Sequence, residues 1–368
     1  MSGDHLPLRR VDHIKFIVGN ARQSAYFYRN AFGFDVTAYA GLETGIREEA
    51  EYVLQQGKIH FVVASPLHRD HPDNQRLALH GDGVKDIALE VDQVADAYEA
   101  TVSRGAVGVT EPTRIEDDNG VYEYATIETY GDTTHTFVNH DDYRGVFAPG
   151  FQSLDPARYS LSTRRPVGLK AIDHIVGNVE LGKMDEWVDF YKQVMGFSQY
   201  IHFDDNDIST EYSALMSKVV QNGNGRIKFP INEPAKGKRK SQIDEYLDFH
   251  NGPGVQHIAM SSADIIDTVT SMLANDVSFL SVPQTYYDTM QERVGEINEN
   301  IAKITELSIL VDRDEEGYLL QLFTKPVEDR PTLFFEVIQR HGSRGFGIGN
   351  FKALFEAIER DQALRGTL

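Results

Sequence analysis

Short runs of alternating apolar and polar residues recur along the chain, and this period of two predicts strands with one buried face. They outnumber the helical patterns, so the chain is expected to be rich in β-structure. In the first half, the predicted strands are Tyr52–Ala64, Ile87–Val91, Tyr122–Thr129 and Thr134–Asn139. In the second half, they are Ile172–Asn178, Ser209–Val220, Ile227–Phe229, Gln256–Ser261 and Tyr318–Phe323.

Helical periodicity appears in a few segments. Tyr26–Phe34 and Asp189–Phe197 each read as an amphipathic helix that ends at a glycine, the residue best suited to a left-handed helix cap. Near the end of the chain, apolar residues follow the spacing i, i+3, i+4, i+7, which predicts an amphipathic helix lying over an apolar surface. These residues are Phe351, Leu354, Phe355 and Ile358.

The chain also repeats itself, and an internal repeat determines the architecture. Val11–Asn20 and Ile172–Val179 both place Asp-His-Ile at the start of an apolar run, and the two predicted helices above match each other. A third match pairs Gly83–Val94 with Gly254–Ile265, each a strand leading into a helix. Because the three matches occur in the same order, we predict two copies of one module. We place the modules at residues 8–150 and 167–368, joined by a linker at 151–166.

Charge and composition restrict the function. Lys and Arg number 36 against 56 Asp and Glu, which gives a formal net charge of −20. A surface this acidic repels phosphate backbones and anionic lipids. Nucleic-acid and membrane partners are therefore not expected. The chain has no cysteine, so a metal would have to be held by His, Asp or Glu. The start of the chain lacks a signal-like apolar segment, and we expect a cytoplasmic protein.

Comparing the two copies points to reactive residues in the second. His13 and His174 stand at equivalent strand starts, whereas Asp86 in the first copy is matched by His257 in the second. Beyond the last predicted strand lies PTLFFEVIQR, a segment with no clear counterpart in the first half, which carries Glu336 between apolar residues. A carboxylate in such a stretch is costly unless a cation neutralises it. Two histidines and one carboxylate form a facial triad for iron(II), although the same ligands also suit zinc.

Several stretches of the second half resemble the 4-hydroxyphenylpyruvate dioxygenase family of the vicinal oxygen chelate superfamily. The resemblance implies an α+β fold: two tandem modules of βαβββ repeats that form open β-barrels, with a C-terminal lid helix at residues 350–362. The stretches are Pro230–Pro234 (PINEP), Lys240–Leu247 (KSQIDEYL), Gly254–Ala259 (GVQHIA), Leu319–Pro326 (LLQLFTKP), Arg330–Gly342 (RPTLFFEVIQRHG) and Gly345–Glu359 (GFGIGNFKALFEAIE).

The resemblance also implies residue roles. One Fe(II) per chain would be held by His174, His257 and Glu336. Catalytic roles would fall to Gln242, Gln256, Gln321 and Phe323. Substrate contacts would come from Ser217, Asn232, Phe334, Phe346, Asn350 and Phe351. Ile348 departs from the family pattern GFGKGNF, and the first module is expected to be a non-catalytic scaffold.

The activity that the resemblance implies is the oxidative decarboxylation of 4-hydroxyphenylpyruvate by O2. Ring hydroxylation with side-chain migration would give homogentisate, a step of tyrosine catabolism, in a homodimer or homotetramer. An alternative is 4-hydroxymandelate synthase, which has the same ligands and substrate but hydroxylates the benzylic carbon. The synthase tends to carry a smaller aliphatic residue where this chain has Phe323. A metal-free binding protein of the same superfamily is a third reading, against which the intact ligand set argues.

Two further patterns are given structural interpretations. His68, His71 and His80 lie in a polar segment that we interpret as a solvated loop and turn, without a second metal site. The glycines of GFGIGN, at residues 345, 347 and 349, resemble a phosphate-binding loop, but no strand of a βαβ unit precedes them. We therefore expect them to give flexibility to the lid.

Overall fold

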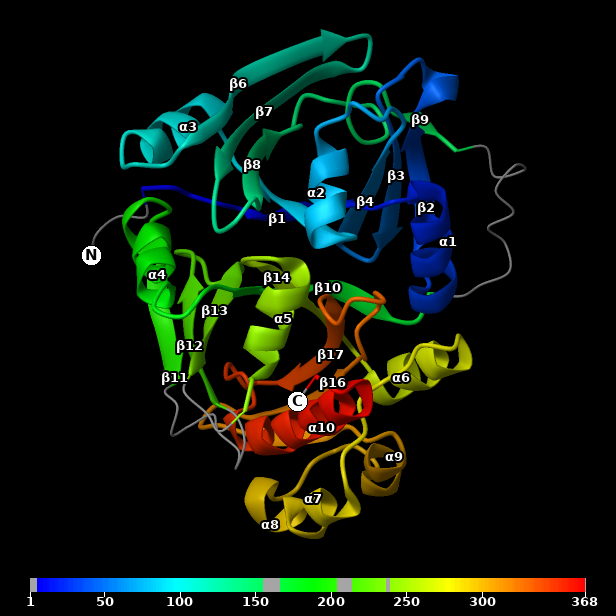
Figure 1. The fold of residues 1–368 in the computed structure, drawn as a ribbon, viewed down its shortest axis with the longest axis vertical. Helices are drawn as coiled ribbons and strands as arrows, with labels where there is room; N and C mark the ends of the chain where they lie inside the picture. The colour runs from blue at the N-terminus through cyan, green and yellow to red at the C-terminus, as the bar shows by residue number, and fades with distance from the viewer. Residues whose placement is uncertain (1–4, 155–165, 204–213, 236–238, 368) are drawn as a thin grey trace.

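The computed structural model describes residues 5–154, 166–203, 214–235 and 239–367. These residues form two strongly curled sheets with helices packed on them, an α+β fold, and Figure 1 shows one sheet above the other. The upper sheet comes from the first half of the chain and has the strand order β6-β7-β8-β5-β1-β4-β3-β2-β9. The lower sheet has the order β11-β12-β13-β10-β14-β17-β16-β15.

The upper sheet is built from nine strands in the described part of the chain. They are β1 (Arg10–Ile17), β2 (Asp35–Ala40), β3 (Glu49–Gln56), β4 (Ile59–Pro66), β5 (Gly83–Glu90), β6 (Gly108–Asp117), β7 (Gly120–Glu128), β8 (Thr134–Asn139) and β9 (Gln152–Ser153). The helices of this half are α1 (Ala21–Phe32), η1 (Leu42–Thr44), α2 (Asp73–His80) and α3 (Val94–Val102).

The lower sheet has eight strands among the described residues. They are β10 (Leu169–Asn178), β11 (Ser198–Phe203), β12 (Ala214–Gln221), β13 (Lys228–Ala235), β14 (Gly254–Ser262), β15 (Leu310–Arg313), β16 (Tyr318–Phe323) and β17 (Phe334–His341). Its helices are α4 (Met184–Gln193), α5 (Gln242–His250), α6 (Ile265–Ala274), α7 (Gln284–Asp288), α8 (Met290–Val294), α9 (Ile301–Glu306), η2 (Ile348–Asn350) and α10 (Phe351–Arg365).

The order of elements confirms the predicted repeat. Each half contains two βαβββ units, the first being β1-α1-β2-β3-β4 and the second β5-α3-β6-β7-β8 in the upper sheet. The lower sheet repeats them as β10-α4-β11-β12-β13 and β14-α6-β15-β16-β17. In each sheet, the first strands of the two units pair with each other at the centre, β1 with β5 and β10 with β14. The predicted module bounds stay a prediction, and most of the predicted linker (155–165) lies outside the described residues.

Some strand predictions need correction. Tyr52–Ala64 is not one strand, because the chain reverses at Gly57, whose φ of 58° lies in the left-handed region, and forms the hairpin β3–β4. Glu336 does not lie beyond the last strand: Phe334–His341 is β17, and it has a counterpart in the first half, β8. The start of the predicted strand Ser209–Val220 falls on residues outside the described ranges.

Both helices of the predicted repeat are present as α1 and α4, but α4 ends at Gln193 with Val194 as its cap residue, not at the expected glycine. The side chain of Asn20 accepts a hydrogen bond from the backbone of Gln23 at the start of α1, and Gly33 ends that helix with a φ of 72°. The expected C-terminal helix is present as α10, and Gly366 caps it in the left-handed conformation. In the described part of the chain, no helix is long and apolar enough to cross a membrane.

Both sheets share one hydrophobic core. The ring of Phe335 on β17 packs edge-on against Phe32 of α1, with centroids 4.9 Å apart, and also contacts Tyr28 and Phe61 at 5.8 and 6.0 Å. Successive side chains of a strand point to opposite faces. Because Phe335 is anchored in the shared core, its neighbours Phe334 and Glu336 face the interior of the lower barrel.

Candidate metal centre

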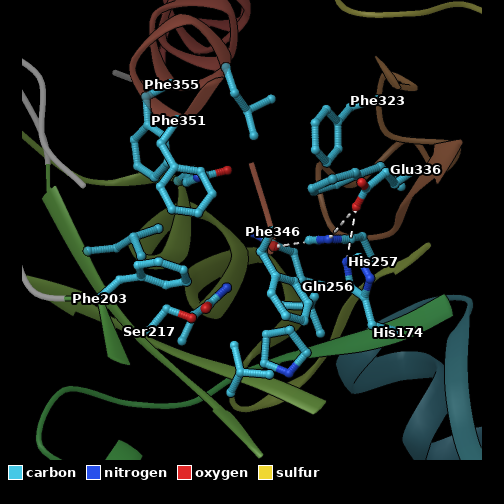
Figure 2. A pocket seen from close by; sticks show the side chains of 18 residues that line it. His174, Phe203, Ser217, Gln256, His257, Phe323, Glu336, Phe346, Phe351 and Phe355 are labelled. Carbon is cyan, nitrogen blue, oxygen red and sulfur yellow. Dashed lines mark hydrogen bonds and ion pairs between the residues drawn. The ribbon is translucent and has the colours of Figure 1, made fainter. Parts of the chain in front are cut away.

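His174, His257 and Glu336 meet on three adjacent strands at the centre of the lower sheet. His174 lies on β10, His257 on β14 and Glu336 on β17. In the β10–β14 ladder, His174 is opposite Ala259, and in the parallel β14–β17 ladder Ala259 is opposite Glu336. This register brings together residues that are far apart in sequence, and Figure 2 shows the three side chains converging.

The donor atoms are spaced as metal ligands are. Glu336 Oε2 lies 3.1 Å from His174 Nε2 and 3.6 Å from His257 Nε2. The three ligand atoms lie within 4.8 Å of one another. All three side chains are largely shielded from solvent, with exposed fractions of 4%, 12% and 3% in chain order. A single ion placed between these atoms would contact all three, which is the geometry of a facial triad.

The other ring nitrogen of each histidine is already engaged. His174 Nδ1 donates to the carboxylate of Asp173 at 2.8 Å, and His257 Nδ1 donates to the side-chain oxygen of Gln256 at 3.0 Å. With Nδ1 as the donor, Nε2 carries the lone pair that a metal needs, and it faces Glu336. The protein therefore selects the tautomer that binds a cation.

A β-bulge places Asp173 beside His174. Ile172 is opposite Met260 and His174 is opposite Ala259, so Asp173 is the extra residue on β10. Arg340 on β17 holds Asp173 through two hydrogen bonds of 2.8 and 2.7 Å and also donates to the backbone oxygen of Gly345. The Arg340 guanidinium lies 5.7 Å from the ring centroid of Phe346. These contacts connect the ligand His174 to the loop that carries Phe346.

Burial and charge act in opposite directions at this site. Burial alone would raise the pKa of Glu336, but the neighbouring His174 and His257 hold it below its usual range. Burial lowers the pKa of His257 and favours the neutral ring. Burial would also raise the pKa of Asp173, but hydrogen bonds from Arg340 and His174 keep that carboxyl ionised. Burial would lower the pKa of His174, but the charges of Glu336 and Asp173 raise it, so a metal ion would have to displace a proton from that ring. The residues present fit a divalent cation, because imidazole nitrogens and an ionised carboxylate are metal ligands.

The centre opens into a cavity lined mainly by apolar side chains. Phe334 stacks on His257 with centroids 4.8 Å apart, and Phe346 contacts His174 edge-on at 5.0 Å. Figure 2 shows Phe351 and Phe355 of α10 on the far side of the cavity and Phe323 above the histidines. Among the described lining residues, Glu336 is the only carboxylate, and none is Lys or Arg. An anionic ligand therefore requires a bound cation to be stable in this cavity.

Most of the predicted site residues line this cavity. Besides the three candidate ligands, they are Ser217, Asn232, Gln242, Gln256, Phe323, Phe334, Phe346 and Phe351. Gln321 and Asn350 are fully buried but do not line it. The Asn350 side chain accepts a hydrogen bond of 2.6 Å from the hydroxyl of Tyr286, and the Gln321 amide packs beside Gly347. Their proposed roles in catalysis and substrate binding stay predictions.

Gly347 shows why glycine is needed in the loop before the lid helix. Its φ is 75°, and a Cβ at this position would lie 2.6 Å from the Gln321 side-chain oxygen. A glycine is therefore required by close packing as well as by conformation. The expected flexibility of this loop stays a prediction.

Sequence reasoning missed some lining and supporting residues. Val176, Phe203, Leu215, Val219 and Pro230 line the cavity, and strand alternation around the predicted residues was the available signal. Leu354 and Phe355 also line it, and both were part of the helical pattern of the last helix. No sequence pattern indicated that Arg340 reaches Asp173, because that contact depends on the pairing of distant strands.

The first module contains a position equivalent to each ligand. His13 is opposite Ala88 in the β1–β5 ladder, as His174 is opposite Ala259. The β5–β8 ladder pairs Asp86 with Thr134, which places Thr136 where Glu336 stands in the second module. The three ligand positions of the first module thus hold His13, Asp86 and Thr136.

His80 corrects the interpretation of the His68–His80 segment as a solvated loop. His80 ends helix α2, is buried, and bonds the backbone oxygen of His250 in the other module. The two imidazole rings stack with centroids 4.2 Å apart. His80 is therefore a contact between the modules.

Comparisons with known proteins agree with the fold and the site. A sequence profile of the Glyoxalase/Bleomycin resistance protein/Dioxygenase superfamily matches residues 10–130 and 171–322. A 4-hydroxyphenylpyruvate dioxygenase from Yarrowia lipolytica is 47% identical over 98% of this chain and 94% of its own length. The enzyme of that name from Dictyostelium discoideum is 48% identical over 97% and 99%. A solved mutant of 4-hydroxymandelate synthase from Streptomyces coelicolor superposes with a TM-score of 0.86 at 32% identity, covering 97% of this chain and 100% of its own.

Proposed function

Since the chain belongs to the 4-hydroxyphenylpyruvate dioxygenase family, we propose that one Fe(II), held by His174, His257 and Glu336, supports its reaction. The enzyme is an oxidoreductase that converts 4-hydroxyphenylpyruvate and O2 to homogentisate and CO2. Both oxygen atoms enter the product, one in the carboxylate formed by decarboxylation and one in the ring hydroxyl. The aromatic side chain migrates to the neighbouring ring carbon in the process.

The observation that carries the proposal is the charge balance of the cavity. Among the described lining residues Glu336 is the only carboxylate and none is Lys or Arg, while the substrate is an anion. Two buried carboxylates close together would repel each other and lose their hydration, at a cost of several kcal/mol. A divalent cation held by His174, His257 and Glu336 would remove that cost. When bound, Fe(II) supplies the redox chemistry that couples O2 to decarboxylation.

The side chains of this protein would position the substrate ring. With the 2-oxo acid group at the ligand atoms, the ring extends between Phe334, Phe346 and Phe351. Ser217 and Asn232 are directly opposite each other on β12 and β13, and Gln242 begins helix α5. These groups line the polar end of an otherwise apolar cavity and are suited to hydrogen-bond the phenol hydroxyl.

Phe323 supports ring hydroxylation over benzylic hydroxylation. Its ring lies 5.9 Å from that of His257 and 6.2 Å from that of Phe334, measured between centroids. At this position the large Phe323 ring limits how closely the benzylic carbon of the substrate can approach the ligand atoms. The synthase that hydroxylates this carbon shares the fold, so the size of this side chain is our proposed difference between the two outcomes.

Helix α10 would close the cavity and exclude water. Phe351, Leu354 and Phe355 face the cavity from this helix. Arg365 at its end makes hydrogen bonds of 3.0 and 2.8 Å to the carboxylate of Glu245 on α5. A closed cavity protects a reactive oxidant from side reactions.

The family membership also supports proposals about the oligomeric state and the cellular location of the protein. We propose that the enzyme acts as a homodimer or homotetramer. The absence of cysteine is compatible with the reducing cytoplasm, where we propose that it works.

Metal titration tests the ligand assignment. Wild-type protein should bind one Fe(II) per chain under anaerobic conditions, and Glu336→Gln should weaken binding by at least about tenfold, because a neutral amide replaces the only anionic ligand. His13→Ala, at the equivalent position of the first module, is the matched control and should retain one Fe(II) and near-wild-type turnover. Full iron binding by Glu336→Gln, or loss of iron in a folded His13→Ala variant, would contradict the assignment.

A further inference from the structure

The first module retains a cavity at the place where the second module holds its metal centre. This cavity has a volume of about 670 Å³. His13, Asp86 and Thr136, the residues at the three ligand positions, all line it. We propose that this cavity is a second binding site, which takes a small organic ammonium compound that carries an aromatic ring.

Strand pairing shows that the two cavities occupy equivalent positions. In the first module, Lys15 takes the place of Val176, Val62 that of Pro230 and Glu51 that of Ser217. On the other side of the centre, Thr126 takes the place of Phe323. All of these residues line the cavity of their own module. Duplication has thus preserved a pocket in the first module while its chemistry has changed.

The changed ligand positions do not suit a metal ion. Asp86 Oδ1 already accepts hydrogen bonds of 2.6 Å from Thr134 and 2.8 Å from Thr136. In the part of the chain that the structure describes, no third His, Asp or Glu joins His13 and Asp86 at metal-ligand spacing. The threonine hydroxyls therefore satisfy Asp86 Oδ1, and the cavity suits an organic ligand better than a metal ion.

The charges of the lining favour a cation. Lys15 is neutralised by Glu49 and Glu51, at 3.4 and 3.0 Å, and Lys85 donates to the backbone oxygen of Asp132. Five carboxylates line the cavity: Glu51, Asp73, Asp86, Glu128 and Asp132. Glu51 is the partner of Lys15, and Asp132 lies 3.3 Å from Arg76 and 3.1 Å from His80, so the excess negative charge rests on Asp73, Asp86 and Glu128. Burial raises the pKa of Tyr122, and the charges of Asp12, Asp86 and Glu51 raise it further. A positive group near Asp86 and Tyr122 would offset this excess of negative charge.

Aromatic side chains form the remaining wall. Phe147 packs edge-on against His13, with centroids 5.1 Å apart, and contacts Phe151 at 5.0 Å. Tyr122 and Tyr124 on β7 also line the cavity. Aromatic faces attract ammonium ions through cation–π interactions and also pack against an aryl ring. Carboxylates and aromatic rings in the lining of one cavity together match an arylalkyl ammonium ion.

Isothermal titration calorimetry with phenethylamine tests this site in the iron-loaded enzyme. The matched control ligand is 2-phenylethanol, which has the same ring and chain but carries no charge. We expect phenethylamine to bind wild type at least about tenfold more tightly than 2-phenylethanol, because charge recognition contributes most of the affinity. Equal affinities, or no heat of binding at millimolar phenethylamine, would overturn the proposal.

Variants locate the bound amine in the first module. Asp86→Asn, which keeps a hydrogen-bond acceptor for the threonines, should weaken phenethylamine binding by about tenfold and leave turnover of 4-hydroxyphenylpyruvate unchanged. Phe147→Leu should weaken binding without altering the charge, and it provides a second test should Asp86→Asn fail to fold. Asp70→Asn removes one charge from the exposed surface of the same module and should bind as wild type. Unchanged binding in both cavity variants would place the amine elsewhere and refute the site.

Discussion

Arg340 holds Asp173 with two nearly parallel hydrogen bonds, from Nε to Oδ2 at 2.8 Å and from Nη2 to Oδ1 at 2.7 Å. Asp173 in turn accepts the Nδ1 proton of His174, so the chain Arg340–Asp173–His174 reaches from the lid loop to the candidate metal. The first module has an equivalent chain, in which His140 Nε2 and His13 Nδ1 donate to Asp12, each at 2.8 Å. The repeat has thus kept the supporting carboxylate in both modules, although only one retains the full ligand set.

This chain predicts that Asp173 controls metal affinity without contacting the metal. Asp173→Asn should reduce Fe(II) affinity by about tenfold to a hundredfold, because His174 loses the charge that fixes its ring and tautomer. Competition with a fluorescent chelator measures the affinity directly. Asp12→Asn changes the equivalent residue of the first module and should leave the affinity unchanged. Equal losses in the two variants would indicate a general effect on folding instead.

Phe323 is predicted to direct hydroxylation to the ring. Phe323→Val should divert a measurable share of product to 4-hydroxymandelate, because the shorter side chain gives the benzylic carbon room near the ligand atoms. Chromatography of the products after complete turnover measures the ratio. Leu322→Val shortens the neighbouring side chain, which belongs to the hydrophobic core on the other face of β16, and should give homogentisate alone. An unchanged product ratio in Phe323→Val would remove this residue as the determinant.

The ion pair between Arg365 and Glu245 is predicted to keep the lid helix closed. Glu245 is 5% exposed, so Arg365→Gln leaves a buried carboxylate without its main partner and favours opening of α10. We expect KM to rise several-fold and O2 consumption to exceed homogentisate formation, as water reaches the reacting centre. An oxygen electrode combined with product assay measures this uncoupling. Lys303→Gln removes one partner of an exposed ion pair on α9 and should stay fully coupled.

His250 is predicted to make stability depend on pH. Burial, together with the charge of His80, lowers its pKa from the ordinary 6.5 to about 3 in the folded protein. Between about pH 6.5 and pH 3, His250 therefore binds a proton in the unfolded chain but not in the folded chain. The stability that neutral His250 contributes is lost as the pH falls through this range. The expected slope is about 1.4 kcal/mol per pH unit for one proton.

Urea unfolding at several pH values compares wild type with His250→Phe, which keeps a ring against His80 and Tyr246 but cannot take up a proton. The variant should lose less stability between pH 6.5 and 4 than wild type. Parallel pH profiles for the two proteins would contradict the assigned titration.

Local signals in the sequence were sufficient for much of the architecture. Helix caps such as Gly33, alternating strands such as Thr134–Asn139 and the repeat of Asp-His-Ile depend on neighbouring residues, and these predictions were confirmed. The hairpin at Gly57 was missed because the apolar residues of β3 and those of β4 lie close together in the sequence and were interpreted as one segment. The strand around Glu336 was missed because β17 is buried on both faces and shows no alternation.

The candidate ligands and most of the cavity lining could be named from the sequence because the comparison of the two modules and the family motifs pointed to them. The contacts that hold these residues in place could not be predicted from the sequence. Arg340 meets Asp173 only because β17 and β10 both pair with β14. The contact of His80 with His250 likewise depends on how the two modules pack, which no local pattern encodes.

The most direct test of the central claim is the identity of the aromatic product. Purified protein with Fe(II), ascorbate and 4-hydroxyphenylpyruvate in air should give homogentisate, identified by NMR, with one CO2 released for each O2 consumed. 4-Hydroxymandelate as the main product would contradict the role assigned to Phe323 and move the enzyme to benzylic hydroxylation. No aromatic product from protein with iron bound would contradict the proposed function itself.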